Sequence, residues 1–205
     1  MSERTRLRRI PENAVTEVAG LHAVLDAARV AHVAFVHDGG PVNIPTAVAR
    51  DGDRLLMHGS TGSRLFRTLA DGAEVCVTVT LLDGMVLARS AFESSMNYRS
   101  AMVFGVPTVV TDKLDALRVM TAAWMPGRWE TLRAPHAKEL AATMVLELPL
   151  VEWSVKVSAG PPEDPPEDLD APVWAGVLPI VSSYGEPVPA PDLRGDPPLP
   201  AYFSA

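Results

Sequence analysis

Short apolar or alternating runs, separated by turn-forming residues, dominate the first part of the chain. Three such runs follow one another at 31–36, 42–48 and 54–57, and the segments between them, 38–41 and 50–53, are rich in Asp and Gly. Alternation with a period of two is typical of strands, and Asp-Gly pairs are typical of tight turns. The pattern predicts a three-stranded antiparallel meander over residues 30–57. Pro45 in the second run indicates an edge, a bulge or a position that faces a ligand.

Further strands and a few helices are predicted along the rest of the chain. Helical spacing of apolar residues favours helices at 13–29, 64–70 and 112–125, the last of them capped by Asp112. Strands are predicted at 75–81, 85–90, 99–110, 143–158 and 173–180, with the first two joined by a turn at residues 82–84. The region 143–158 is either one long strand or two strands that are interrupted at Pro149. Many antiparallel strands with few helices indicate a mainly β fold with flanking helices, a small β-barrel.

The chain is predicted to form one domain with an arm at each end. Its 205 residues, of which 47% are apolar, suffice for a sizeable core. We assign residues 1–12 to a flexible N-terminal arm, residues 13–182 to the barrel domain and residues 183–205 to a Pro-rich C-terminal arm. Such an arm is typically extended, over the surface of its own chain or over a partner subunit.

Composition and charge exclude several classes of partner. The net charge of −7 comes without a basic stripe, so nucleic acid is not an expected partner. The charged N-terminus and the absence of a long apolar run predict neither a secretory signal nor a membrane span, so we expect a cytoplasmic protein. Cys76 is the single cysteine and the five histidines lack the spacing of a zinc site, so no metal centre is expected.

The segment from His58 to Arg64 combines the features of an anion site. It reads His-Gly-Ser-Thr-Gly-Ser-Arg and lies between a predicted strand and a predicted helix. Free N–H groups and the dipole at a helix start favour negative charge, and hydroxyls with a planar guanidinium suit a phosphate. The alternative is a plain strand-to-helix turn with a Ser or Thr N-cap and an exposed arginine.

Two further segments are rich in groups that could face a ligand. Residues 89–100 join two apolar strands and contain Asn97, Tyr98 and two arginines, although a long hydrated loop is the alternative. Trp174 stands two residues before Gly176, which would let a flat ligand approach the backbone, whereas a core tryptophan is the alternative. Together with the loop at 58–64, these segments suit a barrel that holds a flat phosphorylated cofactor.

The order and spacing of these segments resemble the pyridoxamine 5′-phosphate oxidase-like flavoproteins, which are FMN-binding split barrels. The nearer likeness is to the flavin-nucleotide-binding branch that includes the nitroimidazole-resistance reductases. The likeness covers about residues 15–180 and rests on residues 43–46, 58–64, 83–90, 97–105 and 174–179. It implies a six-stranded antiparallel split β-barrel, FMN as cofactor and a homodimer with the flavin at the subunit interface.

The resemblance also implies roles for individual residues. Ser63 and Arg64 match the first two positions of a Ser-Arg-Lys run that grips the FMN phosphate, whereas Leu65 stands in place of the lysine. The further cofactor-binding residues are Asn43, Ile44, Pro45 and Thr46 along the isoalloxazine, Ser60 in the loop, Asn97, Tyr98, Arg99 and Ser100 on a neighbouring strand, and Trp174 near the flavin. His58 matches a histidine that lies near the flavin in the resistance branch, so we expect it to be catalytic.

The resemblance thus implies an FMN-dependent oxidoreductase that reduces a small organic substrate through flavin N5. NAD(P)H is a candidate electron donor, and neither nucleic acid nor a membrane is an expected partner. Vitamin B6 oxidation is not expected, because residues 201–205 lack the Arg and His of the oxidases' C-terminal ending. Two alternatives stay open: a non-catalytic protein that binds FMN, haem or a deazaflavin for storage or sensing, and an interaction protein with an empty barrel.

Overall fold

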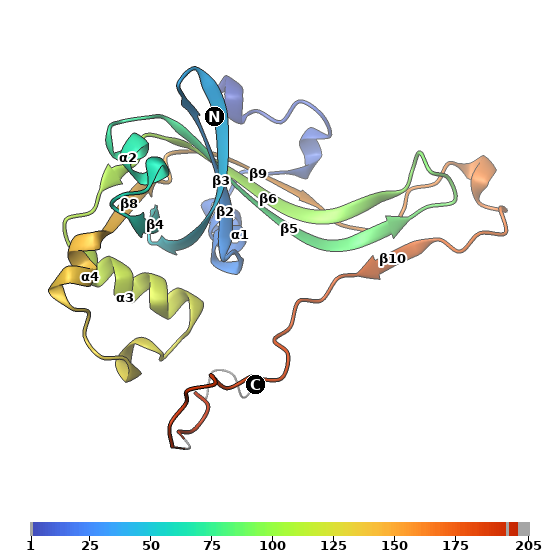
Figure 1. Cartoon of the computed structure of the whole chain (residues 1–205). Coiled ribbons are helices and arrows are strands. Elements are labelled where there is room, and N and C mark those ends of the chain that lie inside the picture. Colours follow the sequence, from blue (N-terminus) through green and yellow to red (C-terminus); the bar gives the residue numbers. More distant parts are fainter. Residues whose placement is uncertain (1, 196, 201–205) are drawn as a thin grey trace.

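One antiparallel sheet organises most of the computed structural model, which describes residues 2–195 and 197–200 (Figure 1). Its strands are β1 (Ala14–Val15), β2 (Val30–His37), β3 (Gly40–Asp51), β4 (Arg54–Ser60), β5 (Val75–Leu87), β6 (Ser95–Gly105), β7 (Thr108–Val109), β8 (Thr143–Pro149), β9 (Glu152–Ser158) and β10 (Gly176–Pro179). Within the described residues the order is β1-β9-β6-β5-β2-β3-β4-β8-β7, and β10 pairs with β5. The mainly β antiparallel class is confirmed, and short strands such as β1, β7 and β10 raise the strand number above the six expected.

Helices flank this sheet, as the sequence predicted. In the described part they are α1 (Val18–Ala27), α2 (Arg64–Ala70), α3 (Lys113–Trp124) and α4 (Ala137–Ala142), with 3-10 turns at Glu3–Thr5, Pro11–Asn13, Trp129–Thr131 and Pro166–Asp168. The Asp112 carboxylate accepts the N–H of Asp115 at 3.1 Å and so caps α3, as expected. The first helix is shorter than the predicted 13–29, because Ala14 and Val15 pair with β9 instead.

Alternate residues of the strands fill the barrel interior. Ala31 and Val33 of β2 are fully buried, whereas His32 between them is exposed on the outer face. The inner faces of β4, β5 and β8 and the apolar side of α1 complete this core. A second, smaller cluster packs Leu56 of β4 against α3, on the opposite face of that strand. The sheet therefore has a core on one side and a helix-covered patch on the other.

The strands β5 and β6 extend beyond the barrel and form a projecting ribbon with β10 (Figure 1). We define the ribbon as residues 82–87 of β5, residues 95–99 of β6 and all of β10. The turn predicted at residues 82–84 is wrong, because β5 runs without interruption from Val75 to Leu87. The Asp-Gly pair forms a bulge instead: Arg99 of β6 binds the Asp83 carboxylate, and the register shifts between Leu82 and Gly84.

A buried ion pair fastens the loop after β9 to the tip of the ribbon. The Asp164 side chain is 1% exposed and accepts the Arg89 backbone N–H at 2.7 Å and the Arg89 Nη1–H at 2.9 Å. This contact holds the loop at the ribbon tip, from which β10 runs back antiparallel to residues 84–87 of β5. The strand predicted at 173–180 is thus shorter than expected and spans Gly176–Pro179.

The two predicted arms differ in their contacts. Thr5 is buried and Arg4 binds both Glu74 and Glu152, so part of the N-terminal segment packs on the domain. Residues 183–195 and 197–200 form an extended, mostly exposed chain, and residues 201–205 of the expected C-terminal arm lie outside the described residues (Figure 1). The flexibility of the N-terminal arm and the domain boundaries stay predictions. Across the described ranges, no helix has both the length and the apolar character that a membrane span requires.

Candidate functional site

The barrel opens where β3 and β4 part. Their ladder ends at Val48, which pairs with Met57. Beyond this point residues 43–47 of β3 keep β2 on one side but have no strand partner on the other side among the described residues. The other side of this opening is formed by residues 58–60 of β4, which continue to pair with β8. In antiparallel strands alternate residues direct both backbone groups to one side, so the free edge of β3 offers N–H donors and C=O acceptors to a ligand. We call this place the split.

The four predicted residues on β3 face two ways. Asn43 and Pro45 are exposed on the outer face, where Pro45 lies opposite His32 of β2. Thr46 is buried, and its hydroxyl donates to the Ile44 carbonyl at 3.3 Å. Asn43 and Pro45 can therefore contact a ligand with their side chains and also turn their backbone carbonyls to the split, whereas the backbones of Ile44 and Thr46 pair with β2.

A tight turn connects β4 to α2. The loop begins later than expected, because His58, Gly59 and Ser60 belong to β4 and pair with β8. Within the turn the Gly62 N–H donates to the Ser60 hydroxyl at 3.1 Å, and the Ser63 N–H donates to the Ser60 carbonyl at 2.9 Å. Ser60 is thus occupied by the turn, whereas the Ser63 hydroxyl has no partner within the described chain.

Two arginines of α2 border a cavity of about 340 Å³, which we call the arginine pocket. Its lining residues are His37, Gly62, Arg64, Arg67, Thr68 and Asp71. In the part of the chain that is described, neither Arg64 nor Arg67 has a hydrogen-bond or ion-pair partner for its guanidinium. Two unpaired positive charges beside a cavity favour an anion, with Asp71 as the opposing charge in the lining. Because α2 has only seven residues, we attribute the preference of this pocket for an anion to the arginine side chains rather than to a helix dipole.

Sequence reasoning missed Arg67 and His37. Arg67 follows Arg64 by three residues, a spacing that places both on one side of a helix, and residues 64–70 were predicted to be helical. That signal could have identified Arg67. The His37 Nδ1 lies 3.3 Å from the Thr68 hydroxyl, a contact between β2 and α2 that local patterns do not contain.

His58 packs against an aromatic ring of α3. The ring centroids of His58 and Trp124 are 5.7 Å apart and their planes are tilted by 39°. The Trp124 Nε1–H donates to the Val48 carbonyl at 2.7 Å, which fixes the indole at the end of the β3–β4 ladder. The imidazole is half-buried, and its Nδ1 is buried without a hydrogen-bond partner among the described residues. Burial lowers the pKa of His58, so the ring is neutral at neutral pH.

The predicted residues of β6 make contacts within the ribbon. Arg99 donates to both carboxylate oxygens of Asp83, at 2.8 and 2.9 Å, and these bonds lower the pKa of the Asp83 carboxyl. The Asn97 amide donates to a backbone carbonyl in the loop after β9 at 3.0 Å. Tyr98 and Ser100 pair through the backbone with both β5 and β9. Arg99 and Asn97 are therefore occupied by contacts inside one chain.

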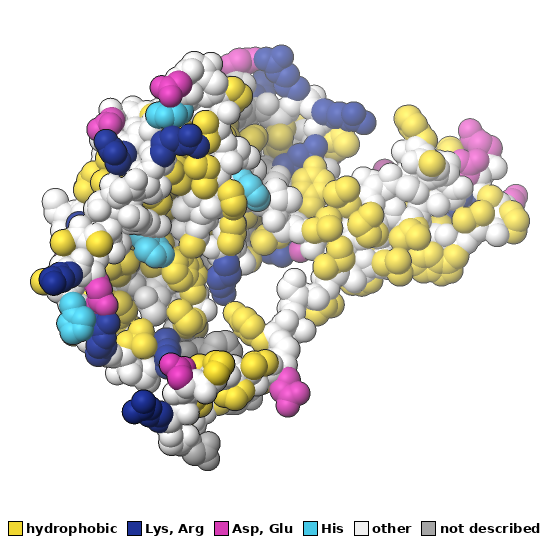
Figure 2. Space-filling view, viewed as in Figure 1, with side chains coloured by type: hydrophobic (Ala, Val, Ile, Leu, Met, Phe, Trp, Pro, Cys, Tyr) yellow, Lys and Arg dark blue, Asp and Glu magenta, His cyan; other side chains and the backbone are white. Residues whose placement is uncertain are grey.

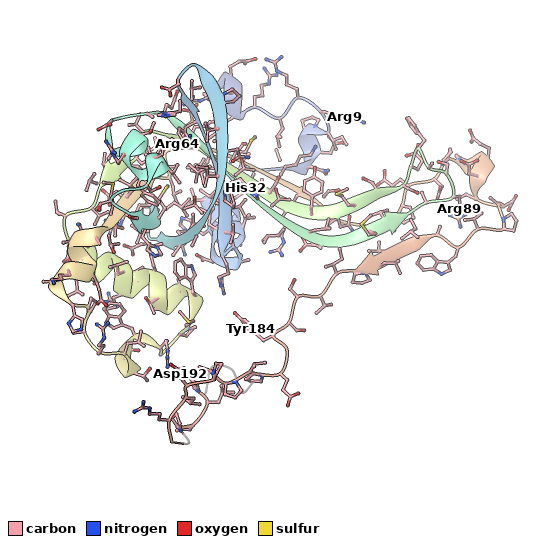
Figure 3. All side chains as sticks on the ribbon, in the orientation of Figure 1. Arg9, His32, Arg64, Arg89, Tyr184 and Asp192 are labelled. Atoms are coloured by element: carbon pink, nitrogen blue, oxygen red, sulfur yellow. The ribbon has the colours of Figure 1, made fainter. Side chains whose placement is uncertain are left out.

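Trp174 lies two residues before β10, near the tip of the ribbon. Its side chain is 63% exposed, and a Cβ added to Gly176 would lie 2.8 Å from the indole, so the ring rests on the glycine. Gly176 pairs with Leu87, close to Arg89 at the ribbon tip, whereas Arg64 lies at the opposite end of the molecule (Figure 3). Within one chain the predicted site residues therefore fall into two separate groups. The barrel group lies around the split and the arginine pocket, and the ribbon group consists of the predicted residues of β6 together with Trp174.

Near-full-length similarity relates this chain to two solved structures. The flavocytochrome Anf3 from Azotobacter vinelandii is 41% identical with a TM-score of 0.92, over 99% of this chain and 96% of that chain. An FAD and haem binding protein from Mycobacterium smegmatis is 46% identical with a TM-score of 0.90, over 94% of this chain and 96% of that chain. A candidate 5-nitroimidazole antibiotic resistance protein from Bacteroides thetaiotaomicron shares the fold, with 18% identity and a TM-score of 0.60 over 70% and 86% of the two chains.

A family model also matches most of the barrel. No curated protein matches the chain. The model described as pyridoxamine 5′-phosphate oxidase matches residues 17–157, which include the split and the arginine pocket. The resemblance inferred from the sequence is thereby confirmed: the chain belongs to the pyridoxamine 5′-phosphate oxidase-like family.

Proposed function

We propose that this protein binds FAD and haem and acts as an oxidoreductase. The observation that carries the proposal is its identity of 41% and 46%, over nearly complete chains, to a flavocytochrome and to an FAD and haem binding protein. Oxidoreductase activity is the role that the sequence favoured for a flavin, and a haem is a second group able to transfer electrons. Storage or sensing without turnover is the competing function.

The arginine pocket supports FAD over the FMN expected from the sequence. Arg64 and Arg67 offer two unpaired guanidiniums, and the Ser63 hydroxyl lies next to Arg64 in the chain. A guanidinium binds phosphate oxygens through two parallel N–H groups. FMN carries one phosphate whereas FAD carries two, so a pair of unpartnered arginines matches the pyrophosphate.

The split suits the ring system of a flavin. A bound flavin supplies hydride and single-electron transfer. The free backbone edge of residues 43–47 would donate to the polar edge of the ring, and aligned N–H groups stabilise negative charge that develops there. Asn43 and Pro45 would contact the ring from the exposed face, and His58 lies across the split on β4. The catalytic role of His58 stays a prediction, and its neutral ring at pH 7 favours accepting a proton over donating one.

Cofactor content tests this proposal. We expect protein purified after expression with haem precursors to show a flavin spectrum and a Soret band, and chromatography of the released flavin to identify FAD. Anaerobic bleaching of the flavin by NADH or NADPH would support an oxidoreductase, whereas a bound flavin that no donor reduces would favour storage or sensing. Colourless protein that retains neither added FAD nor added haem would contradict the proposal.

We also infer that two copies of the chain assemble through the ribbon. Leu178, Met85 and Met96 lie side by side across its three strands, and they are 52%, 42% and 43% exposed. Figure 2 shows hydrophobic side chains gathered along this projection. Contiguous exposed apolar residues mark interaction surfaces. A second copy of this chain fits best, because it could bring the ribbon group of one chain to the barrel group of the other.

The mass in solution tests this assembly. We expect light scattering to give 44 kDa, twice the 22.0 kDa of one chain. In the double variant Met85→Glu with Met96→Glu, two negative charges would replace the apolar contact between the ribbons. We expect this variant to have the mass of one chain and a lower flavin content than the wild type. Val151→Glu is the matched control, since Val151 is 85% exposed in the turn between β8 and β9. A wild-type mass of one chain at micromolar concentration would contradict the inference.

A further inference from the structure

A haem site needs a side chain that can bind iron with a free lone pair. A neutral imidazole in an apolar setting meets this requirement, whereas a protonated ring does not. All five histidines of this chain lie within the described residues and on different parts of the fold. Their surroundings decide which of them is suited to iron.

Three of the histidines are poorly placed. His37 uses both ring nitrogens, with Nδ1 3.3 Å from the Thr68 hydroxyl and Nε2 3.5 Å from the Asp38 carboxylate. His22 lies on α1 with its Nε2 3.6 Å from an Asp53 carboxylate oxygen. His136 is exposed in the loop immediately before α4. His37 therefore has no free ring nitrogen and His136 is exposed, whereas the His22 Nε2 is buried without a hydrogen-bond partner among the described residues but has an acidic side chain, Asp53, as its neighbour.

The other two histidines lie on the outer face of the sheet, close to the split. His32 is exposed and lies opposite Pro45 on β3 (Figure 3). His58 is half-buried on β4, where Val145 of β8 lies opposite and Trp124 of α3 packs against the ring. Both neighbours of His58 belong to the apolar cluster under α3, so the ring is an imidazole at the border of a hydrophobic patch. His32 has no comparable apolar cover.

We propose that His58, packed against Trp124, is the axial ligand of the haem iron. The inference rests on the proposed haem function and deepens it. Nδ1 is buried, so Nε2 is the ring nitrogen available to the iron. In this role His58 binds the iron and does not take part in the flavin chemistry that the resemblance implied for it.

The experiment compares single variants of the full chain after haem reconstitution. His58→Gly should weaken haem binding at least about 100-fold, while the far-UV circular dichroism spectrum stays as in the wild type. Added imidazole should restore the haem spectrum, because it can occupy the space that the variant opens. His32→Ala and His136→Ala are the matched controls and should keep the wild-type Soret band.

A second variant keeps the test decisive if the glycine variant folds poorly. His58→Cys should convert the spectrum of the ferrous carbonyl complex to that of a thiolate-ligated haem, a change that only a residue bound to iron can cause. A histidine-ligated spectrum that persists in both His58 variants, or that is lost in His32→Ala, would overturn the assignment. A wild-type protein that binds FAD but no haem would instead remove the proposed haem function itself, and the ligand assignment with it.

Discussion

Replacing Arg64 and Arg67 together with alanine is expected to weaken FAD binding by about 10²-fold to 10³-fold. Hydrogen bonds from a guanidinium to a charged partner contribute about 1.5–3 kcal/mol each. Both arginines are exposed, so solvent screening places the pair at the low end, about 3–4 kcal/mol together, and about 1.4 kcal/mol corresponds to a tenfold change in Kd. Quenching of flavin fluorescence, titrated with apoprotein at fixed ionic strength, measures the change.

The matched control removes the same charge elsewhere. Arg118 and Arg133 are exposed but paired with Asp115 and Glu139, and replacing both with alanine should leave the Kd for FAD within about twofold. The single variant Arg67→Ala separates the two flavins, because it should weaken FAD more than FMN if Arg67 binds the second phosphate. An unchanged Kd in the double variant would place the phosphates outside the arginine pocket.

Gly59→Ala is expected to destabilise the fold by about 2–3 kcal/mol, a large part of the roughly 5–15 kcal/mol that holds a domain together. Gly59 lies on β4, where a Cβ would come within 2.2 Å of Phe66 Cε2 and within 3 Å of two other atoms of that ring. Phe66 is 4% exposed in the barrel core and has little room to move. Urea unfolding followed by tryptophan fluorescence gives the loss of unfolding free energy.

A rescue and a control identify the cause. Phe66→Leu shortens the ring that the new methyl group meets, so adding it to Gly59→Ala should recover part of the lost stability. Gly40→Ala, on the neighbouring strand β3, should cost little, because the nearest atom to its Cβ would lie 3.8 Å away. If the alanine at 59 is as stable as wild type, the close packing of α2 on β4 would be contradicted.

The strongest local patterns predicted their elements well. The bounds of α2 agree with the expected 64–70, and β2 and β3 follow the alternation around the turn at 38–41. Here alternate residues face one core, and the turn residues allow the backbone that the hairpin needs, including a positive φ of 75° at Gly39. In these segments the local sequence preference and the tertiary packing favour the same structure, so the sequence pattern alone predicted the observed elements.

Prediction from the sequence failed where distant contacts override a local signal. Asp83 and Gly84 read as a hairpin turn, yet Arg99 on β6 and the addition of β10 hold β5 straight through them. The contact between His58 and Trp124 joins residues far apart in the chain, and no local pattern contains it. The separation of the barrel and ribbon groups likewise follows from the length of β5, which the misread turn concealed.

The short strand β10 has a consequence for solubility. β2 pairs with β5 only at residues 76–78, so this edge of the ribbon would present unpaired backbone groups beside exposed methionine and leucine side chains. Such an edge is a template on which strands of other molecules can add and aggregate. β10 covers residues 84–87 of that edge, and the ion pair between Arg89 and Asp164 anchors the loop that leads to it. We therefore expect the C-terminal segment to protect the ribbon from polymerising, and a chain cut before Gly176 to lose this protection while keeping an intact barrel.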